Sequence, residues 1–218
     1  MWKVLPKSLV FKIIVYLFSI IIFIIALLSS KILGQDNFSN LHFHNILKTS
    51  ILAATISLIL VYIIGKWGWK PLWNMPILGV ILNRHLCPDL NGEWSGEVYS
   101  SYKENGGENK ITKVDVIIKA DFFKFSMEFT SRNKYQTSKV VFSDLYKDTR
   151  KNNFYIAYIF ESTVLNPQEF DDKNFDGAAR LEIKYTDGVL TLEGLYWTNR
   201  AFQRGLNTSG HIVLTKVK

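Results

Sequence analysis

The sequence is poor in cysteine, and Cys87 is the only one among its 218 residues. A single cysteine cannot form a disulfide within the chain, so a disulfide-stapled fold is excluded. The same scarcity excludes a zinc site built on several cysteines. Apolar residues, in contrast, make up 48% of the chain, and the mean hydropathy of +0.07 is high for a soluble domain. This composition is typical of a chain that lies partly in a membrane.

Acidic residues are nearly missing from the first 87 positions, where Asp36 stands against eight basic residues. The whole chain has 26 basic and 19 acidic residues, so 18 of each remain from Pro88 onward. The formal charge of +7 therefore lies entirely in the apolar N-terminal part. A basic face for a DNA or RNA polymer is not expected on the balanced C-terminal part.

The motifs of common catalytic sites are also missing. The sequence has no Gly-x-Ser-x-Gly, no His-Glu-x-x-His, no Walker loop and no dinucleotide-fold glycine fingerprint. Residues 172–177 match the first half of an EF-hand loop, but Ile183 replaces the glutamate of the twelfth position, so we expect an acidic surface turn. His42 and His44 have no third ligand nearby and are expected to be ordinary loop residues. We predict no enzyme, no catalytic residue, no metal and no cofactor.

Two long uncharged runs lie near the N-terminus. Residues 13–30 read IIVYLFSIIIFIIALLSS, and residues 49–65 read TSILAATISLILVYIIG. At about 1.5 Å per residue, each is long enough to cross a hydrocarbon core of about 30 Å. A signal peptide has a shorter apolar region, and a core helix that is apolar all round needs a larger soluble body. We predict a segment of residues 1–66 with two transmembrane helices, at about 10–30 and 47–65.

The charges beside the runs predict their orientation. Three lysines precede the first run, and Lys66, Lys70 and Arg84 follow the second. Because basic residues gather on the cytoplasmic side, both termini are expected in the cytoplasm and the pair forms a hairpin. Residues 67–87, broken by Pro71 and Pro76, are expected to be a linker at the membrane interface.

From Pro88 onward, apolar and polar residues alternate with a period of two, which is typical of strands. The Asp187-Gly188 pair is a strong signal for a two-residue hairpin. No helical stretch intervenes, so residues 88–218 are predicted to form an all-β domain. Closure of its antiparallel sheet into a barrel removes the exposed edges. We predict eight strands, at residues 92–101, 109–119, 122–130, 135–143, 153–160, 178–185, 189–199 and 210–216.

The inward face of the seventh predicted strand changes character along its length. It begins with leucines and continues through Tyr196 and Thr198 to Arg200. A charge on an inward face is unfavourable unless it is paired or meets a ligand anion. Two interpretations stay open: Arg200 is solvated or paired at the barrel mouth, or it binds an anionic ligand.

The segment that follows strengthens the ligand interpretation. Arg204 adds a second guanidinium group close to aromatic side chains. Guanidinium groups match phosphate oxygens, and aromatic rings stack on nucleobases. The tripeptide Gly92-Glu93-Trp94 is similar to the Gly-x-Trp of lipocalin-type barrels, in which the tryptophan plugs one end. The candidate ligand-binding residues are Trp94, Tyr196, Thr198, Asn199, Arg200 and Arg204.

Nearly the whole chain resembles one known family. A predicted membrane hairpin precedes PDLNGEWSG at residues 88–96, which opens the all-β part, and GLYWTNR stands at residues 194–200 near its end. In this arrangement the chain resembles the two-transmembrane β-barrel effectors of bacterial cyclic-oligonucleotide-based antiphage signalling (CBASS).

The resemblance implies a cytosolic barrel that binds a cyclic dinucleotide made by a partner nucleotidyltransferase during phage infection. Binding would drive homo-oligomerisation, and the transmembrane segments would then disrupt the bacterial inner membrane and kill the infected cell. Neither apolar run contains a charge, so bulk disruption of the bilayer is expected rather than a selective ion pathway.

Two rival functions stay open on the sequence. A membrane-tethered lipocalin-like barrel would hold a lipid or another apolar molecule, and its binding would not depend on Arg200. A filled barrel would act only as an interaction module in an envelope complex.

Overall fold

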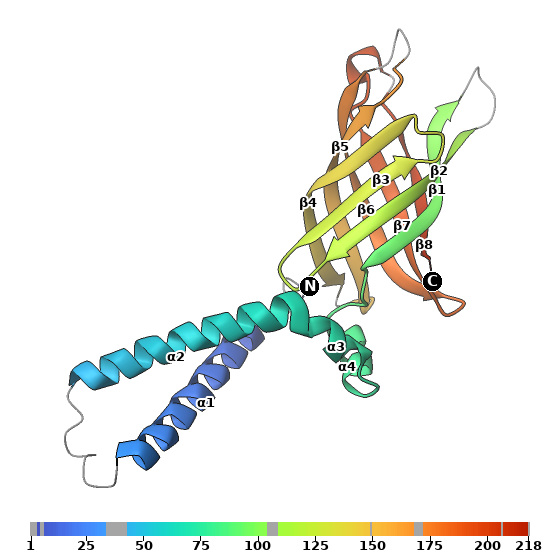
Figure 1. The fold of residues 1–218 in the computed structure, drawn as a ribbon. Helices are drawn as coiled ribbons and strands as arrows, with labels where there is room; N and C mark the ends of the chain where they lie inside the picture. The colour runs from blue at the N-terminus through green and yellow to red at the C-terminus, as the bar shows by residue number, and fades with distance from the viewer. Residues whose placement is uncertain are drawn as a thin grey trace. The chain divides into compact units, whose positions relative to one another are not determined.

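The computed structural model describes residues 4, 7–33, 43–103, 109–148, 150–167, 172–205 and 207–217. Its chain divides into two compact units (Figure 1). One unit comprises residues 5–75 and is helical, and the other comprises residues 76–218 together with the first four residues. The boundary falls inside the segment predicted as a linker, residues 67–87.

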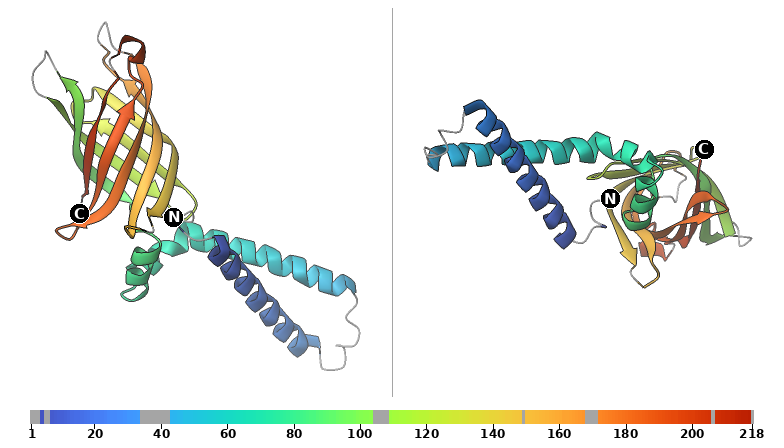
Figure 2. Two further views of the ribbon diagram at one scale, coloured as in Figure 1. Left: turned by 180° about the vertical axis from the view of Figure 1, so that it is seen from behind. Right: turned by 90° about the horizontal axis from the view of Figure 1, so that it is seen from below.

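The larger unit is a closed barrel of eight antiparallel strands, as the alternation predicted (Figure 2). Each strand pairs with the next along the chain, and β8 pairs with β1 to close the ring. One short helix, α4 (Leu78–His85), precedes the barrel. The strands are β1 (Gly92–Lys103), β2 (Asn109–Ala120), β3 (Phe125–Ser131), β4 (Gln136–Asp148), β5 (Asn153–Val164), β6 (Asn174–Thr186), β7 (Val189–Thr198) and β8 (Ser209–Lys216).

Alternation along the strands places apolar residues inside the barrel. In β2, Val114, Val116 and Ile118 are buried, while the residues between them are exposed. The predicted hairpin at Asp187-Gly188 is confirmed, and both residues have positive φ, of 52° and 76°. Two successive positive φ angles are those of a type I′ turn, whose twist suits antiparallel strands.

Several predicted strand bounds were wrong, since β3 begins at Phe125 rather than at residue 122 and β5 continues to Val164 rather than ending at residue 160. β4 continues to Asp148 rather than ending at residue 143, because a bulge between Val140 and Phe142 adds one residue and interrupts the period of two. The acidic turn predicted at residues 172–177 was wrong from Asn174 onward, where β6 begins. Pairing of β6 with β5 there outweighs the turn propensity of Asn, Asp and Gly.

One end of the barrel is a packed core. Trp94 is 1% exposed, and its indole Nε1 donates a hydrogen bond to the carbonyl oxygen of Leu90 at 2.9 Å. Leu181, Leu192 and Leu214 fill the interior above it and are fully buried. The chain enters the barrel at this end, where Gly92 begins β1. These buried side chains form a core like that of an ordinary globular domain.

Cys87 is buried in the barrel unit, and burial raises the pKa of its thiol from 9.0 to about 12. The unfolded chain releases the thiol proton near pH 9, whereas the folded chain keeps it up to about pH 12. The thiol therefore contributes stability that is fully present below pH 9 and is lost as the pH rises to about 12.

We expect the free energy of unfolding of Cys87→Ala to decline less steeply with pH in this range than that of the wild type. Urea unfolding at pH values below and above 9 measures both slopes. Equal slopes for the two proteins would contradict the effect of burial on the thiol.

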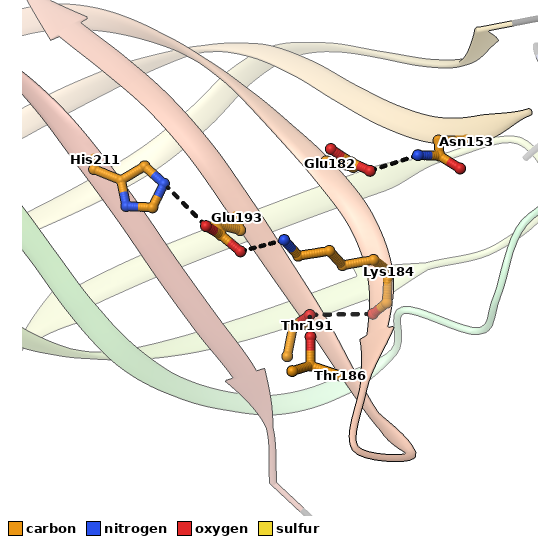
Figure 3. Close-up of polar contacts among 7 residues, drawn as sticks. All are labelled: Asn153, Glu182, Lys184, Thr186, Thr191, Glu193 and His211. Atoms are coloured by element: carbon orange, nitrogen blue, oxygen red, sulfur yellow. Dashed lines mark hydrogen bonds and ion pairs between the residues drawn. The ribbon is translucent and has the colours of Figure 1, made fainter. Parts of the chain in front are cut away.

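Polar side chains make contacts with one another on the outer wall of β5 to β8 (Figure 3). The carboxylate of Glu193 pairs with the ammonium group of Lys184. Nε2 of His211 lies 3.4 Å from Oε1 of the same carboxylate. The hydrogen bond from Lys184 lowers the pKa of Glu193. Asn153 Nδ2 donates to Glu182 Oε1 at 2.6 Å on the neighbouring strands. These pairs are solvent-facing, as the alternation of the strands requires.

The helical unit begins with α1 (Lys7–Leu33) and α2 (Phe43–Ile63), which contact each other. The π-helix η3 (Ile64–Gly68) and α3 (Trp69–Asn74) continue α2. Among the described residues, the segment Ser50–Asn74 is the single one long and apolar enough to cross a membrane, and Val10–Ile25 is a shorter apolar helix. The transmembrane hairpin therefore stays a prediction. His42 lies outside the described residues, and His44 belongs to α2 rather than to a loop.

Candidate ligand-binding site

The other end of the barrel encloses a cavity of about 480 Å³. The cavity lies at the end of the barrel opposite Trp94, where each odd-numbered strand leads into the next even-numbered strand. All eight strands contribute to its wall. Its lining mixes aromatic rings, hydroxyl and amide groups and cations: Val98, Ser100, Tyr102, Lys110, Thr112, Val114, Phe129, Ser131, Asn133, Tyr135, Gln136, Ser138, Tyr158, Phe160, Phe175, Tyr196, Thr198, Arg200, Ala201, Arg204, Thr208 and Ile212.

Four of the six sequence-predicted ligand residues line this cavity: Tyr196, Thr198, Arg200 and Arg204. Asn199 instead points to the outer side, where its Oδ1 accepts a hydrogen bond from the backbone N–H of Asp176 at 2.7 Å. Trp94 is in the packed core at the opposite end. The structure therefore does not bring Asn199 or Trp94 to the cavity, and we leave both out of the candidate site.

Arg200 stands at the mouth between two aromatic rings. Its Nη2 donates a hydrogen bond to the hydroxyl of Tyr135 at 3.0 Å, and its Cζ lies 5.9 Å from the centre of that ring. The ring of Phe175 is 5.4 Å away. Lys110 Nζ lies 5.8 Å from the same Tyr135 ring, so a second cation faces this group. Cation–π contacts and the hydroxyl hold the guanidinium group in place at the opening.

The loop that carries the arginines is attached to the start of β6. The carboxylate of Asp172 accepts a hydrogen bond from the backbone N–H of Ala201 and lies 3.5 Å from Arg204 Nη2. Asn199 adds two hydrogen bonds to the backbone of Asp176: its Oδ1 accepts from the N–H of Asp176, and its own N–H donates to the carbonyl oxygen of Asp176. The acidic string that resembles half an EF-hand therefore serves to position this loop.

Aromatic rings form the inner part of the cavity, and glycines make room for them. A Cβ atom at Gly177 would lie 2.3 Å from the Phe160 ring, and one at Gly210 would lie 2.8 Å from the Tyr196 ring. The Tyr196 hydroxyl bonds to Ser100, and burial raises the pKa of Tyr196. The rings of Phe160 and Tyr196 are thus packed against the backbone of the neighbouring strands.

Gln136 and Ser138 on β4 are a polar part of the site that the sequence did not reveal, and Ser162 on β5 bonds to them. The hydroxyls of Ser138 and Ser162 are 2.7 Å apart, and Gln136 Nε2 donates to both, at 3.3 and 3.2 Å. In the sequence, polar residues that face inward cannot be told from polar residues that face outward, because a shift of one residue exchanges the two faces of a strand. Only the pairing of β4 with β5 shows on which face Gln136 and Ser138 lie.

The arrangement suits an anionic ligand that also carries flat, neutral groups. Cations stand at the mouth beside the rings of Tyr135 and Phe175, and further rings with amide and hydroxyl groups line the rest of the cavity. The volume falls within the range of about 300–1,000 Å³ that is usual for small-molecule sites.

Comparison with known proteins agrees with this arrangement. Residues 85–216 match the family model described as Cap15, cyclic dinucleotide receptor domain. The chain belongs to the Cap15 family. The matched range extends from the last residue of α4 to the last residue of β8, so it contains the whole barrel and its cavity.

Similarity to Cap15 proteins extends beyond the barrel. The chain is 32% identical over 220 residues to CD-NTase-associated protein 15 of Escherichia albertii, which covers 99% of this chain and 98% of that protein. It is also 32% identical over 155 residues to CD-NTase-associated protein 15 of Staphylococcus schleiferi, 70% of this chain and 69% of that protein. The resemblance to the β-barrel effector family of CBASS is thereby confirmed for this Cap15 chain.

Proposed function

We propose that this chain is a CBASS effector that detects a cyclic dinucleotide in its barrel and then acts on the bacterial inner membrane. The observation that carries the proposal is the cavity with Arg200 and Lys110 beside Tyr135 at its mouth and aromatic rings deeper inside. Membership in a family described by a cyclic dinucleotide receptor domain supports the ligand class. The role is that of a binding protein rather than an enzyme.

The charges of the cavity fit two phosphates. A cyclic dinucleotide carries two phosphate charges, and the cavity is lined by Lys110, Arg200 and Arg204. Because Arg204 already lies 3.5 Å from the carboxylate of Asp172, Arg200 and Lys110 have the larger share of this role. Charge-assisted hydrogen bonds to phosphate are about twice as strong as neutral ones.

The proposed action on the membrane rests on the helical unit. Large apolar side chains of α1 and α2 are exposed, among them Phe11 at 68%, Phe23 at 64% and Leu58 at 70%. Hydrocarbon chains of a bilayer are a suitable environment for such surfaces. We propose that both helices cross the inner membrane, with both termini and the barrel in the cytoplasm, and that ligand-bound barrels associate so that their helices disrupt the bilayer.

Titration of the full chain in detergent against a panel of cyclic dinucleotides tests the proposed ligand. We expect saturable binding of at least one cyclic dinucleotide and weaker binding of its linear counterpart, which lacks the closed, preorganised ring. Calorimetry or fluorescence of the aromatic residues measures the Kd. Absence of saturable binding across the panel would refute the proposal.

A lipid as the natural ligand is less well supported. The lining includes Lys110, Arg200, Gln136 and Ser138, and an apolar molecule would displace water from these polar groups without offering them a hydrogen bond. Binding of a fluorescent fatty acid that is equally strong in the wild type and in Arg200→Ala, with no dinucleotide binding, would favour the lipocalin-like function instead.

A further inference from the structure

The hydroxyl of Tyr158 is a buried polar group near the inner end of the cavity. Tyr158 lines the cavity but is only 2% exposed, and its hydroxyl has no hydrogen-bond partner among the described residues. A buried hydroxyl without a partner destabilises a protein by about 1–3 kcal/mol. A group held in this unfavourable state inside a ligand cavity is a candidate for a contact that forms only when the ligand binds.

The rings around Tyr158 favour a flat, neutral group. The ring of Phe129 stacks on it with centres 6.1 Å apart and planes at 29°, and the ring of Phe160 lies 6.0 Å away. Burial raises the pKa of Tyr158, so its hydroxyl stays protonated and uncharged. A phosphate placed against these rings would lose its hydration without meeting a cation.

The strand register shows that this position is deeper than the arginine. Tyr158 pairs with Ala179, and Ala179 pairs with Tyr196, so the three residues form one row across β5, β6 and β7. Phe160, Gly177 and Thr198 form the next inward row toward the mouth, and Arg200 follows beyond the end of β7. A ligand whose phosphates meet Arg200 therefore directs a different part toward Tyr158.

Small residues neighbour the two tyrosines in the register. Ala179 pairs with both Tyr158 and Tyr196, and Gly210 pairs with Tyr196, whose ring takes the room that a Cβ atom at Gly210 would need. A nucleobase that reaches these rings can stack on them, and base stacking contributes about 1–3 kcal/mol.

We infer that Tyr158 is a specificity-determining residue whose hydroxyl hydrogen-bonds to the inner nucleobase of the bound cyclic dinucleotide. This inference rests on the proposed function. The hydroxyl can donate to a ring nitrogen or carbonyl oxygen of the base and accept from an amino group. The base restores to the hydroxyl the hydrogen bond that it lacks in the free protein, and the phosphates stay at the mouth.

Tyr158→Phe in the full chain tests this inference, with the cyclic dinucleotide of the panel that binds the wild type most tightly as the probe. We expect its Kd to rise about tenfold, which equals about 1.4 kcal/mol. The Tm of the ligand-free variant should be unchanged or higher, because the substitution deletes a buried polar atom without a partner. A merely structural hydroxyl would lower the Tm instead.

Tyr155→Phe is the matched control. Tyr155 is on the same strand and 6% exposed, but it stacks on Tyr146 and does not line the cavity. We expect its Kd to equal that of the wild type.

An unchanged Kd in Tyr158→Phe, together with loss of binding in Arg200→Ala, would overturn this inference and leave the proposed function standing. A lower Tm in Tyr158→Phe would also overturn it. If the wild type binds no member of the panel, both this inference and the proposed function fail.

Discussion

Replacing Arg200 with alanine should weaken the binding of the cyclic dinucleotide at least about 100-fold, or about 2.7 kcal/mol. The guanidinium group is held at the mouth by the Tyr135 hydroxyl at 3.0 Å and by the ring of Phe175 at 5.4 Å. A group fixed in this way loses little further freedom when it binds a phosphate. Hydrogen bonds to charged groups contribute about 1.5–3 kcal/mol each, and the variant leaves a phosphate without its partner. Calorimetric titration of the full chain measures the loss.

Two further variants make this result specific. Arg132→Ala removes an arginine that pairs with Asp115 at 2.9 Å and does not line the cavity, so its Kd should equal that of the wild type. Arg200→Lys keeps the charge but loses the planar fork, so we expect an intermediate loss. A Kd for Arg200→Ala within twofold of the wild type would contradict the assignment of Arg200 to a phosphate.

Addition of the cyclic dinucleotide to vesicles that contain the full chain should release an enclosed dye, with little release in its absence. Moving a population from 1% to 99% of an associated state requires about 5.5 kcal/mol of preferential binding. Two stacked bases at about 1–3 kcal/mol each and charge-assisted phosphate contacts are sufficient for such a shift. Vesicles of phosphatidylethanolamine and phosphatidylglycerol, with chemical crosslinking in parallel, measure release and association together.

Controls separate signalling from nonspecific damage. Arg200→Ala should insert into the vesicles as the wild type does but should neither crosslink nor release dye at ligand concentrations that saturate the wild type. Arg132→Ala should behave like the wild type. Equal release with and without ligand, or binding that changes neither crosslinking nor release, would refute the proposed action on the membrane.

Much of the barrel was predictable from local pattern. All eight strands were found because a sheet with a buried inner face requires alternation, and the Asp187-Gly188 turn is encoded within four residues. The errors in β4 and β6 lie where this rule is interrupted. The bulge at Val140 and Phe142 concealed the second half of β4, and the turn-forming residues after Asp172 concealed the start of β6.

The candidate site was predictable only along β7. Alternation placed Tyr196, Thr198 and Arg200 on one face, and the structure has all three at the cavity. The same rule should have excluded Asn199, which lies between two inward residues and bonds outward to Asp176. Trp94 was included with the Gly-x-Trp tripeptide of lipocalin-type barrels, but the tripeptide does not specify whether the ligand lies at the end that the tryptophan plugs.

By itself, the sequence determined the class of the barrel, the inward face of each regular strand and the separation of the apolar, basic N-terminal part from the balanced rest. These properties follow from neighbours along the chain. Only the tertiary structure decided that one end is packed around Trp94 while the other holds a cavity of about 480 Å³. It also decided that Tyr158, Gln136 and Lys110 share that cavity with Arg200. The reason is that ring closure brings together strands distant in sequence, and their register sets the depth of each side chain.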